Sequence, residues 1–85
     1  MQHLIPGGAV ASQFILPGTI VERGGMTYEV TTTPLVRATD GALVFAAVNE
    51  LGGIEPLVIE RDVMVPFYNR VSEEEFEGYL ASRRG

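Results

Sequence analysis

The chain has 85 residues, of which 46% are hydrophobic and 20% charged, and this composition predicts a single folded globular domain. Eleven acidic residues against six basic ones give a net charge of −5, which disfavours binding to nucleic acid through its phosphates. The absence of cysteine excludes disulfides, thiolate nucleophiles and cysteine-ligated metals, and no apolar run approaches the roughly 20 residues that span a bilayer.

Ten glycines and five prolines indicate many turns rather than long helices. Pro6 with Gly7, and Pro17 with Gly18, each suit the two central positions of a type II turn, so each pair predicts strand, turn, strand. Residues 1–16 then form an N-terminal segment. A hairpin follows, with its turn at Gly24 and Gly25, and residues 26–33 alternate as a half-buried strand does.

Two further hairpins are predicted from turn chemistry and register. Asp40 and Gly41 suit a two-residue turn that pairs Val36 with Phe45. A three-residue loop at positions 51–53, with a left-handed glycine, pairs Phe45 with Ile59 and keeps both apolar side chains on one face. These hairpins form a core over residues 19–69.

The last strand and the helix complete the chain. Residues 63–69 read as a strand that Pro66 restricts to an edge or bulged position, because proline cannot donate to a ladder. Ser72 and Glu75 form a capping box, so a short helix is expected over residues 72–84. The sequence therefore predicts a mainly β single domain over residues 1–85. Its architecture is a small antiparallel barrel or sandwich of about five to six strands with one short C-terminal α-helix.

The inventory of reactive side chains is poor, with one histidine, three serines and no lysine. An amine, two amides and an imidazole at Met1-Gln2-His3 have the spacing that surrounds Cu(II), although an ordinary exposed histidine explains the same residues. The glycine pairs lack the spacing of phosphate-binding loops. We expect no catalytic, cofactor or metal site, and no small-molecule substrate.

The clearest candidate site is apolar. The strand around residues 42–49 is apolar on both faces, so one face packs in the core and the other needs a second cover. The terminal helix, the N-terminal segment near Phe14 and Leu16, or another protein could supply it. The candidate interface residues are Leu35, Val44, Ala46, Val48, Val58, Phe76, Tyr79 and Leu80.

The run Pro17-Gly18-Thr19-Ile20-Val21, followed by Gly24-Gly25-Met26-Thr27-Tyr28-Glu29-Val30, resembles the opening hairpin of SH3-like small β-barrels. The resemblance covers about a sixth of the chain and implies an architecture that serves protein binding, nucleic-acid binding and viral assembly. The C-terminal helix departs from that pattern, and no binding residue of the family transfers to this chain.

All six basic residues are arginine, a bias expected of a GC-rich genome such as that of an actinobacterium or its phage. Pro6 interrupts the N-terminal apolar stretch and no basic residue precedes it, so we expect no signal peptide. These features predict a cytoplasmic protein or a component of an intracellularly assembled particle such as a virion.

The function we expect is that of a non-catalytic interaction or assembly subunit, phage-encoded, that acts as a virion component or binds a host factor. Its partner is then another protein or further copies of the chain, and neither nucleic acid nor membrane. The alternative is a small regulator of nucleic acid or of a nucleic-acid enzyme, which acts through arginine contacts or through acidic mimicry by residues 73–75 with Glu77.

Overall fold

The computed structural model describes residues 3–84, and seven strands among them form one antiparallel sheet. The order is β1-β7-β2-β3-β5; β4 pairs with β5 further along the edge that β3 uses, and β6 pairs with the opposite edge. The mainly β class with one C-terminal helix is confirmed, and the sheet is not closed into a barrel. The elements are β1 (His3–Ala11), a 3₁₀ turn (Ser12–Phe14), β2 (Ile20–Arg23), β3 (Met26–Val30), β4 (Leu35–Val36), β5 (Leu43–Asn49), β6 (Ile54–Ile59), β7 (Met64–Val71) and α1 (Glu73–Arg84).

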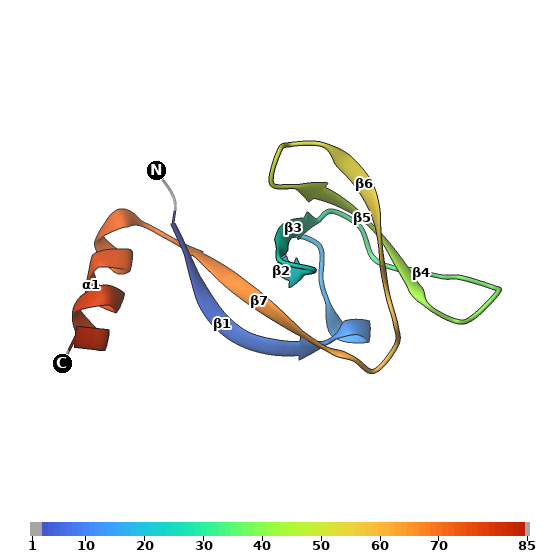
Figure 1. The fold of residues 1–85 in the computed structure, drawn as a ribbon, viewed down its shortest axis with the longest axis horizontal. Coiled ribbons are helices and arrows are strands. Elements are labelled where there is room, and N and C mark those ends of the chain that lie inside the picture. The colour runs from blue at the N-terminus through green and yellow to red at the C-terminus, as the bar shows by residue number, and fades with distance from the viewer. Residues whose placement is uncertain (1–2, 85) are drawn as a thin grey trace.

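The molecule is a curved body with a long arm (Figure 1). Strands β2 to β6 form the body, while β1 and β7 run out of it as a two-stranded arm that carries α1 at its tip. The principal extents are 49 × 25 × 20 Å, and the radius of gyration of 14.2 Å exceeds the value of about 12 Å expected for a compact domain of this length. The chain is therefore elongated, with its helix remote from β5 and β6.

The N-terminal segment differs from the prediction. Residues 3–11 form one strand with a β-bulge between Pro6 and Gly8, and no turn interrupts it. Gly7 lies so close to the ring of Phe67 that an added Cβ would meet its Cε2 at 2.4 Å. The sequence pattern could not show this, because the ring that presses on Gly7 comes from a strand about 60 residues later in the chain.

The turn at Pro17 and Gly18 is confirmed as type II, but the strand predicted before it is absent, since the 3₁₀ turn and two irregular residues precede Pro17. The Thr19 N–H donates to the Leu16 carbonyl at 3.1 Å, and Gly18 has a φ of 92°. The β2–β3 turn is also as predicted, since Gly24 and Gly25 both have positive φ and Arg23 pairs with Met26. Strand β3 ends at Val30, however, and does not continue through the predicted residues 31–33.

The predicted two-residue turn at Asp40 and Gly41 is wrong. Strands β4 and β5 close at Arg37 and Ala42 instead, where the Arg37 N–H donates to the Ala42 carbonyl at 2.7 Å. The cause is the Asp40 side chain, whose carboxylate accepts hydrogen bonds from the Ala42 N–H at 3.0 Å and from Arg37 Nε at 2.9 Å. A longer loop allows both contacts.

The predicted three-residue loop between β5 and β6 is right in length but lies one residue earlier, at positions 50–52. The Asn49 N–H donates to the Gly53 carbonyl at 2.8 Å, and Gly52 is the left-handed glycine with a φ of 85°. Asn49 fixes this placement, because its Oδ1 accepts hydrogen bonds from the N–H groups of Leu51 and Gly53, both at 2.9 Å.

Both hairpins therefore have a register different from the predicted one. Val36 pairs with Leu43 rather than with Phe45, and Phe45 pairs with Leu57 rather than with Ile59. Each shift is two residues, an even number, so every side chain keeps the face that was predicted for it. The core is the buried cluster of Ile15, Val21, Val30, Leu43, Phe45, Ala47, Leu57, Ile59 and Val65.

The last strand is at an edge only locally. Strand β7 as a whole lies between β1 and β2, but at Pro66 it pairs with β1 alone, so the edge position predicted from Pro66 holds locally and not for the whole strand. The proline is tolerated because β2 pairs only with Phe67 and Tyr68, which leaves one side of β7 without a neighbouring strand at Pro66.

The 3₁₀ turn after β1 binds the loop between β6 and β7. The Ser12 side chain is fully buried; its Oγ donates to the Glu60 carbonyl at 2.6 Å and its N–H donates to the Val63 carbonyl at 2.8 Å. The Gln13 side chain forms two hydrogen bonds with Asp62. Its Nε2 donates to Asp62 Oδ1 at 2.6 Å, and its Oε1 accepts the Asp62 N–H at 3.0 Å. These contacts hold Asp62 at its positive φ of 63°.

The helix begins as predicted. The Ser72 Oγ accepts the Glu75 N–H at 3.2 Å, and the Glu75 carboxylate returns to the Ser72 N–H at 3.4 Å, which is the reciprocal pattern of a capping box.

Gly7→Ala should destabilise the protein by about 1–3 kcal/mol, because the Phe67 ring or the β1 backbone must move to admit a methyl group. The matched control is Gly78→Ala in α1, where an added Cβ meets nothing within 4 Å and should stabilise by up to about 1 kcal/mol. Urea unfolding measures both changes. Equal stability of the two variants would contradict the close approach at Gly7.

Ser12→Ala should cost about 1–3 kcal/mol, since it leaves the Glu60 carbonyl without its buried donor. Hydrogen exchange should rise locally in residues 59–65 as the loop loses its attachment. A Ser82→Ala variant on the exposed part of α1 is the control and should leave both measurements unchanged. Unchanged exchange in the Ser12 variant would show that the loop does not depend on this contact.

Candidate protein-binding surfaces

One face of β4, β5 and β6 is apolar and open to solvent. Residues paired directly across antiparallel strands share a face, and the pairs here are Leu35 with Val44, Val44 with Val58, Ala46 with Pro56, and Val48 with Ile54. Leu43, Phe45 and Ala47 alternate with them and face the core. We call the following seven residues the outer sheet face: Leu35, Val44, Ala46, Val48, Ile54, Pro56 and Val58.

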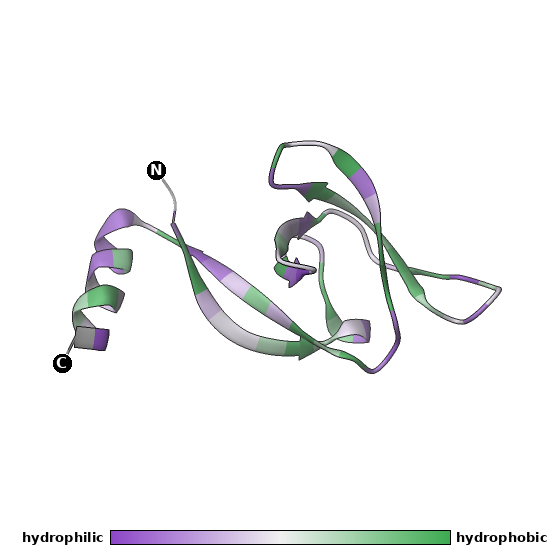
Figure 2. Cartoon of the chain, viewed as in Figure 1, coloured by the Kyte–Doolittle hydropathy of each residue, from purple (hydrophilic) through white to green (hydrophobic). Residues whose placement is uncertain are grey.

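The exposure of this face is uneven and highest at its margins. Ile54 is 80% exposed, Leu35 is 75% exposed and Val58 is 39% exposed, whereas Val44 and Ala46 between them are half-buried. The centre forms an open groove of about 590 Å³, bordered on one side by Thr32 and Thr33. In Figure 2 the β5 strand is coloured almost wholly as hydrophobic.

Thr32 and Thr33 line the groove in the segment between β3 and β4. The Thr31 N–H and Oγ1 both donate to the Ala46 carbonyl, at 2.8 and 3.0 Å, and Thr32 Oγ1 accepts the Ala46 N–H at 3.0 Å. The backbone groups of Ala46 are thus satisfied internally, so the groove offers an apolar surface with its neighbouring polar groups already paired.

The free edge of β6 is poorly suited to pairing with another strand. Because Asn49 pairs with Gly53 by a hydrogen bond, the alternation of an antiparallel ladder turns the backbone groups of Ile54, Pro56 and Val58 away from β5. The proline in the middle has no N–H to donate. This edge therefore presents fewer donors to an added strand than an ordinary free edge does.

The eight residues predicted as one interface separate into two groups. Leu35, Val44, Ala46, Val48 and Val58 lie on the outer sheet face, whereas Phe76, Tyr79 and Leu80 lie in α1 at the other end of the molecule (Figure 1). The intramolecular cover expected from the helix is absent, because only Ser72 stands between β7 and α1 and the helix stays with the arm.

The helix packs on the start of the arm. The Phe76 ring stacks on His3, with centroids 4.3 Å apart and planes 7° from parallel, and Val71 beneath is buried. Leu80 remains 37% exposed. The apolar side of α1, formed by Phe76, Tyr79 and Leu80, is thus only partly covered by its own chain.

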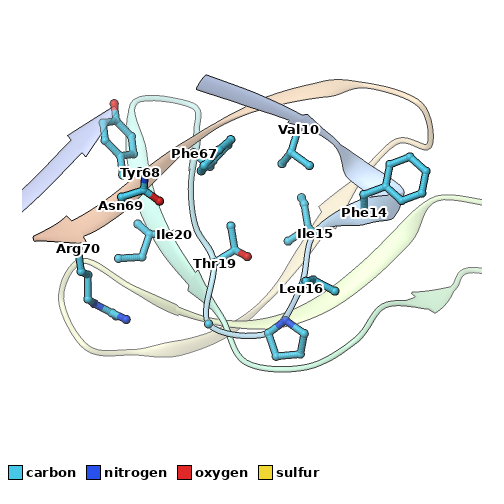
Figure 3. Close-up of a pocket in the computed structure, with 12 residues that line it drawn as sticks. Val10, Phe14, Ile15, Leu16, Thr19, Ile20, Phe67, Tyr68, Asn69 and Arg70 are labelled. Carbon is cyan, nitrogen blue, oxygen red and sulfur yellow. The ribbon is translucent and has the colours of Figure 1, made fainter. Parts of the chain in front are cut away.

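A second groove, of about 430 Å³, lies where the arm meets the body (Figure 3). Phe14 and Leu16 are each 68% exposed at its margin, on either side of the buried Ile15. The segment near Phe14 and Leu16 was one of three possible covers for the sheet face, and this groove was not predicted from the sequence. The alternation around Ile15 was the signal that could have revealed it, since residues on both sides of a buried one point away from the core.

The polar side chains at one end of the second groove are held by contacts within the chain. Arg70 forms an ion pair with Glu29, and Tyr68 Oη donates to Glu22 at 3.1 Å. The Glu22 carboxylate raises the pKa of Tyr68, because a phenolate beside it would lose the hydrogen bond and meet a like charge. Arg70 is thus paired with Glu29, whereas Glu22 keeps its negative charge beside Tyr68.

Within residues 3–84 there is no group of three or more histidine, aspartate or glutamate side chains that could hold a metal ion. Met1 and Gln2, two of the three residues of the copper-binding pattern, lie outside the described residues, and His3 lies against Phe76. Over the same part of the chain, no helix has the length and apolar character needed to cross a membrane.

Comparisons with known proteins do not identify a relative of this chain. No protein-family model, no curated protein and no solved structure matches the chain.

The ion pair in the β4–β5 loop gives a prediction about pH. The hydrogen bond from Arg37 holds the pKa of Asp40 at about 2, below its ordinary value of 3.8. A lowered pKa adds stability above the ordinary value, and this stability is lost as the pH falls through about 2.

Asp40→Asn should therefore lower the melting temperature slightly at neutral pH, and the difference from the unmodified protein should vanish near pH 2. Thermal unfolding followed by circular dichroism at several pH values measures this. Arg37→Gln should behave alike, and added salt should weaken both effects because the pair is exposed. A difference that persists unchanged at the lowest pH would contradict the role of the charge.

Proposed function

We propose that this chain is a non-catalytic protein-binding subunit of a larger assembly and that the outer sheet face is its binding surface. The observation that carries the proposal is the exposure of Leu35 and Ile54, at 75% and 80%, on either side of an apolar groove. Contiguous apolar patches of this kind mark association surfaces, since water in contact with them is released on binding.

The elongated shape supports an assembly role. A chain of 85 residues that spans 49 Å offers surfaces at both ends to different neighbours, at the cost of a smaller core. The setting that we propose is an intracellularly assembled particle, such as a phage virion, in which the partner is protein.

The charged side chains favour protein binding over an action on nucleic acid. Arg37 and Arg70 are taken up by ion pairs with Asp40 and Glu29, and Glu75 caps its own helix. Each of these charges has a role inside the chain, whereas the apolar side chains of Leu35 and Ile54 have none. Protein binding therefore accounts for more of the surface than binding of nucleic acid does.

The double variant Leu35→Glu with Ile54→Glu should lose partner capture by about tenfold or more while remaining folded, because both side chains are exposed in the free chain and a charge in a desolvated interface finds no partner. The measurement is retention of proteins from a lysate of the producing cell on the immobilised chain, at low and at high salt, with circular dichroism to verify folding.

The matched control is Leu51→Glu, which adds the same charge at a hairpin tip that is 91% exposed and lies off the face. It should capture the same proteins as the unmodified chain. Capture that survives high salt and is lost only in the double variant supports the proposal. Equal capture by all three proteins would place the binding surface elsewhere, and capture abolished by salt would favour an electrostatic partner.

A further inference from the structure

The outer edge of the arm is a free strand edge. Strand β1 ends the sheet and has β7 on one side only, and its middle forms the lower border of the arm in Figure 1. Pro6, Gly7, Gly8 and Ala9 are all exposed there, and residues 3–11 include no lysine, arginine, aspartate or glutamate. Charged side chains are a common protection of such edges against pairing, and β1 lacks that protection.

The backbone groups that face outward near the end of β1 follow from one hydrogen bond. The Ser12 N–H donates to the Val63 carbonyl at 2.8 Å, so these two residues form a hydrogen-bonded pair. The antiparallel ladder alternates from there, and Ala11 and Ala9 therefore direct their N–H and C=O groups away from β7. The position of Pro66 agrees with this, because it lies opposite Ala9 and has no N–H to donate.

Before the bulge, the same groups are identified from β2. Ile20 turns its backbone toward β7, because its neighbour Thr19 accepts a hydrogen bond from β3 at 2.9 Å. Ile20 pairs with Tyr68, so the backbone groups of Tyr68 face β2 rather than β1. Pro6 lies opposite Tyr68, and it therefore faces away from β7, as does Leu4 two residues earlier.

The outward groups are evenly spaced, because the bulge adds one residue without disturbing the order on the partner strand. They lie opposite alternate residues of β7, at intervals of about 7 Å. The outward residues are Leu4, Pro6, Ala9 and Ala11, opposite Arg70, Tyr68, Pro66 and Met64. An even row of donors and acceptors matches a second copy of itself in the antiparallel direction, since each end of the row then faces the other end.

Pro6 selects one register for such a pair. If Leu4 faces Ala11 of the second copy, then Pro6 faces Ala9, and the Pro6 carbonyl accepts the Ala9 N–H without a donor of its own being required. Gly8 then meets Gly8 in a non-hydrogen-bonded pair, where Cα atoms approach to about 4.5 Å and glycine leaves no side chains to crowd. A shift of two residues either sets Pro6 against Pro6 or leaves Leu4 unpaired.

From this geometry we infer that two copies of the chain pair β1 with β1, antiparallel, across a two-fold axis at Gly8. The two-stranded arms of both copies then form one four-stranded sheet. Because the contact is isologous, it uses the free β1 edge of both copies, and association stops at two. The outer sheet face stays open in this dimer, so the inference goes beyond the proposed function and does not depend on it.

The variant Ala11→Pro of the full chain tests the pairing. Ala11 has a φ of −63°, the value that proline requires, and its N–H faces away from β7, so the folded chain loses no hydrogen bond. The proline ring removes this donor and lies against the carbonyl of Leu4 opposite. Sedimentation of the unmodified protein should approach twice the mass of one chain as concentration rises, and Ala11→Pro should associate about tenfold or more weakly. The control Ala11→Ser keeps the N–H and should associate as the unmodified protein does.

Disulfide formation between two variants tests the register. The chain has no cysteine, so Leu4→Cys and Ala11→Cys each introduce a single thiol. In the dimer the two positions have Cα atoms about 5.5 Å apart, within disulfide reach, whereas within one copy they are about 20 Å apart. An oxidised mixture should yield the mixed cross-linked dimer, and each variant alone about tenfold less. Cross-linking of Leu4→Cys with itself would indicate parallel strands and overturn the inference.

The remaining outcomes also decide. An unmodified protein that is monomeric at every concentration overturns the inference, and one that nevertheless captures another protein through the outer sheet face leaves the proposed function intact. Dimers that persist in Ala11→Pro but are lost in Leu35→Glu with Ile54→Glu would place the contact on that face instead. Circular dichroism verifies folding, and if Ala11→Pro does not fold, the cross-linking result decides, because neither cysteine variant alters the backbone.

Discussion

The fold depends on the attachment of the first strand's end to the loop that follows the sixth. Strands β1 and β6 are the two ends of an open sheet, and no ladder joins them. Buried Ser12 and its neighbour Gln13 join them instead, through hydrogen bonds to the backbone of Glu60, Asp62 and Val63. A short irregular turn thus performs the closure that strand pairing performs in a barrel, and it encloses the core that the curved sheet surrounds.

The sequence predicted the faces of the strands better than their registers. Alternation places Phe45 inside and Val44 outside whatever its partner is, and both register errors were even, so the predicted core face and outer face survived. The loops were misplaced because single side chains, Asp40 and Asn49, bind backbone N–H groups two or more residues away. Such contacts compete with the usual turn preferences, and glycine position alone does not reveal them.

The candidate site was predictable in chemistry but not in arrangement. Hydropathy identified the residues of the sheet face and of the helix stripe, and turn and cap signals placed the elements that carry them. Their separation depends on β7, which continues through eight residues as part of an arm and leaves the helix at the far tip. No local sequence pattern predicts the arm, because the arm forms by pairing of residues 3–11 with residues 64–71, which lie at opposite ends of the chain.

The way the arm is anchored also has a mechanical consequence. Strand β7 connects α1 to the body, yet β2 pairs with this strand only at Phe67 and Tyr68. A force applied to the helix therefore acts at the end of a long arm that few residues hold to the body. The hydrogen bonds of Ser12, at the opposite end of β1, oppose rotation of the arm relative to the body. Bending of the arm relative to the body would therefore be concentrated at that junction, where β2 pairs with only two residues of β7 and Val10, Val65 and Phe67 join the core.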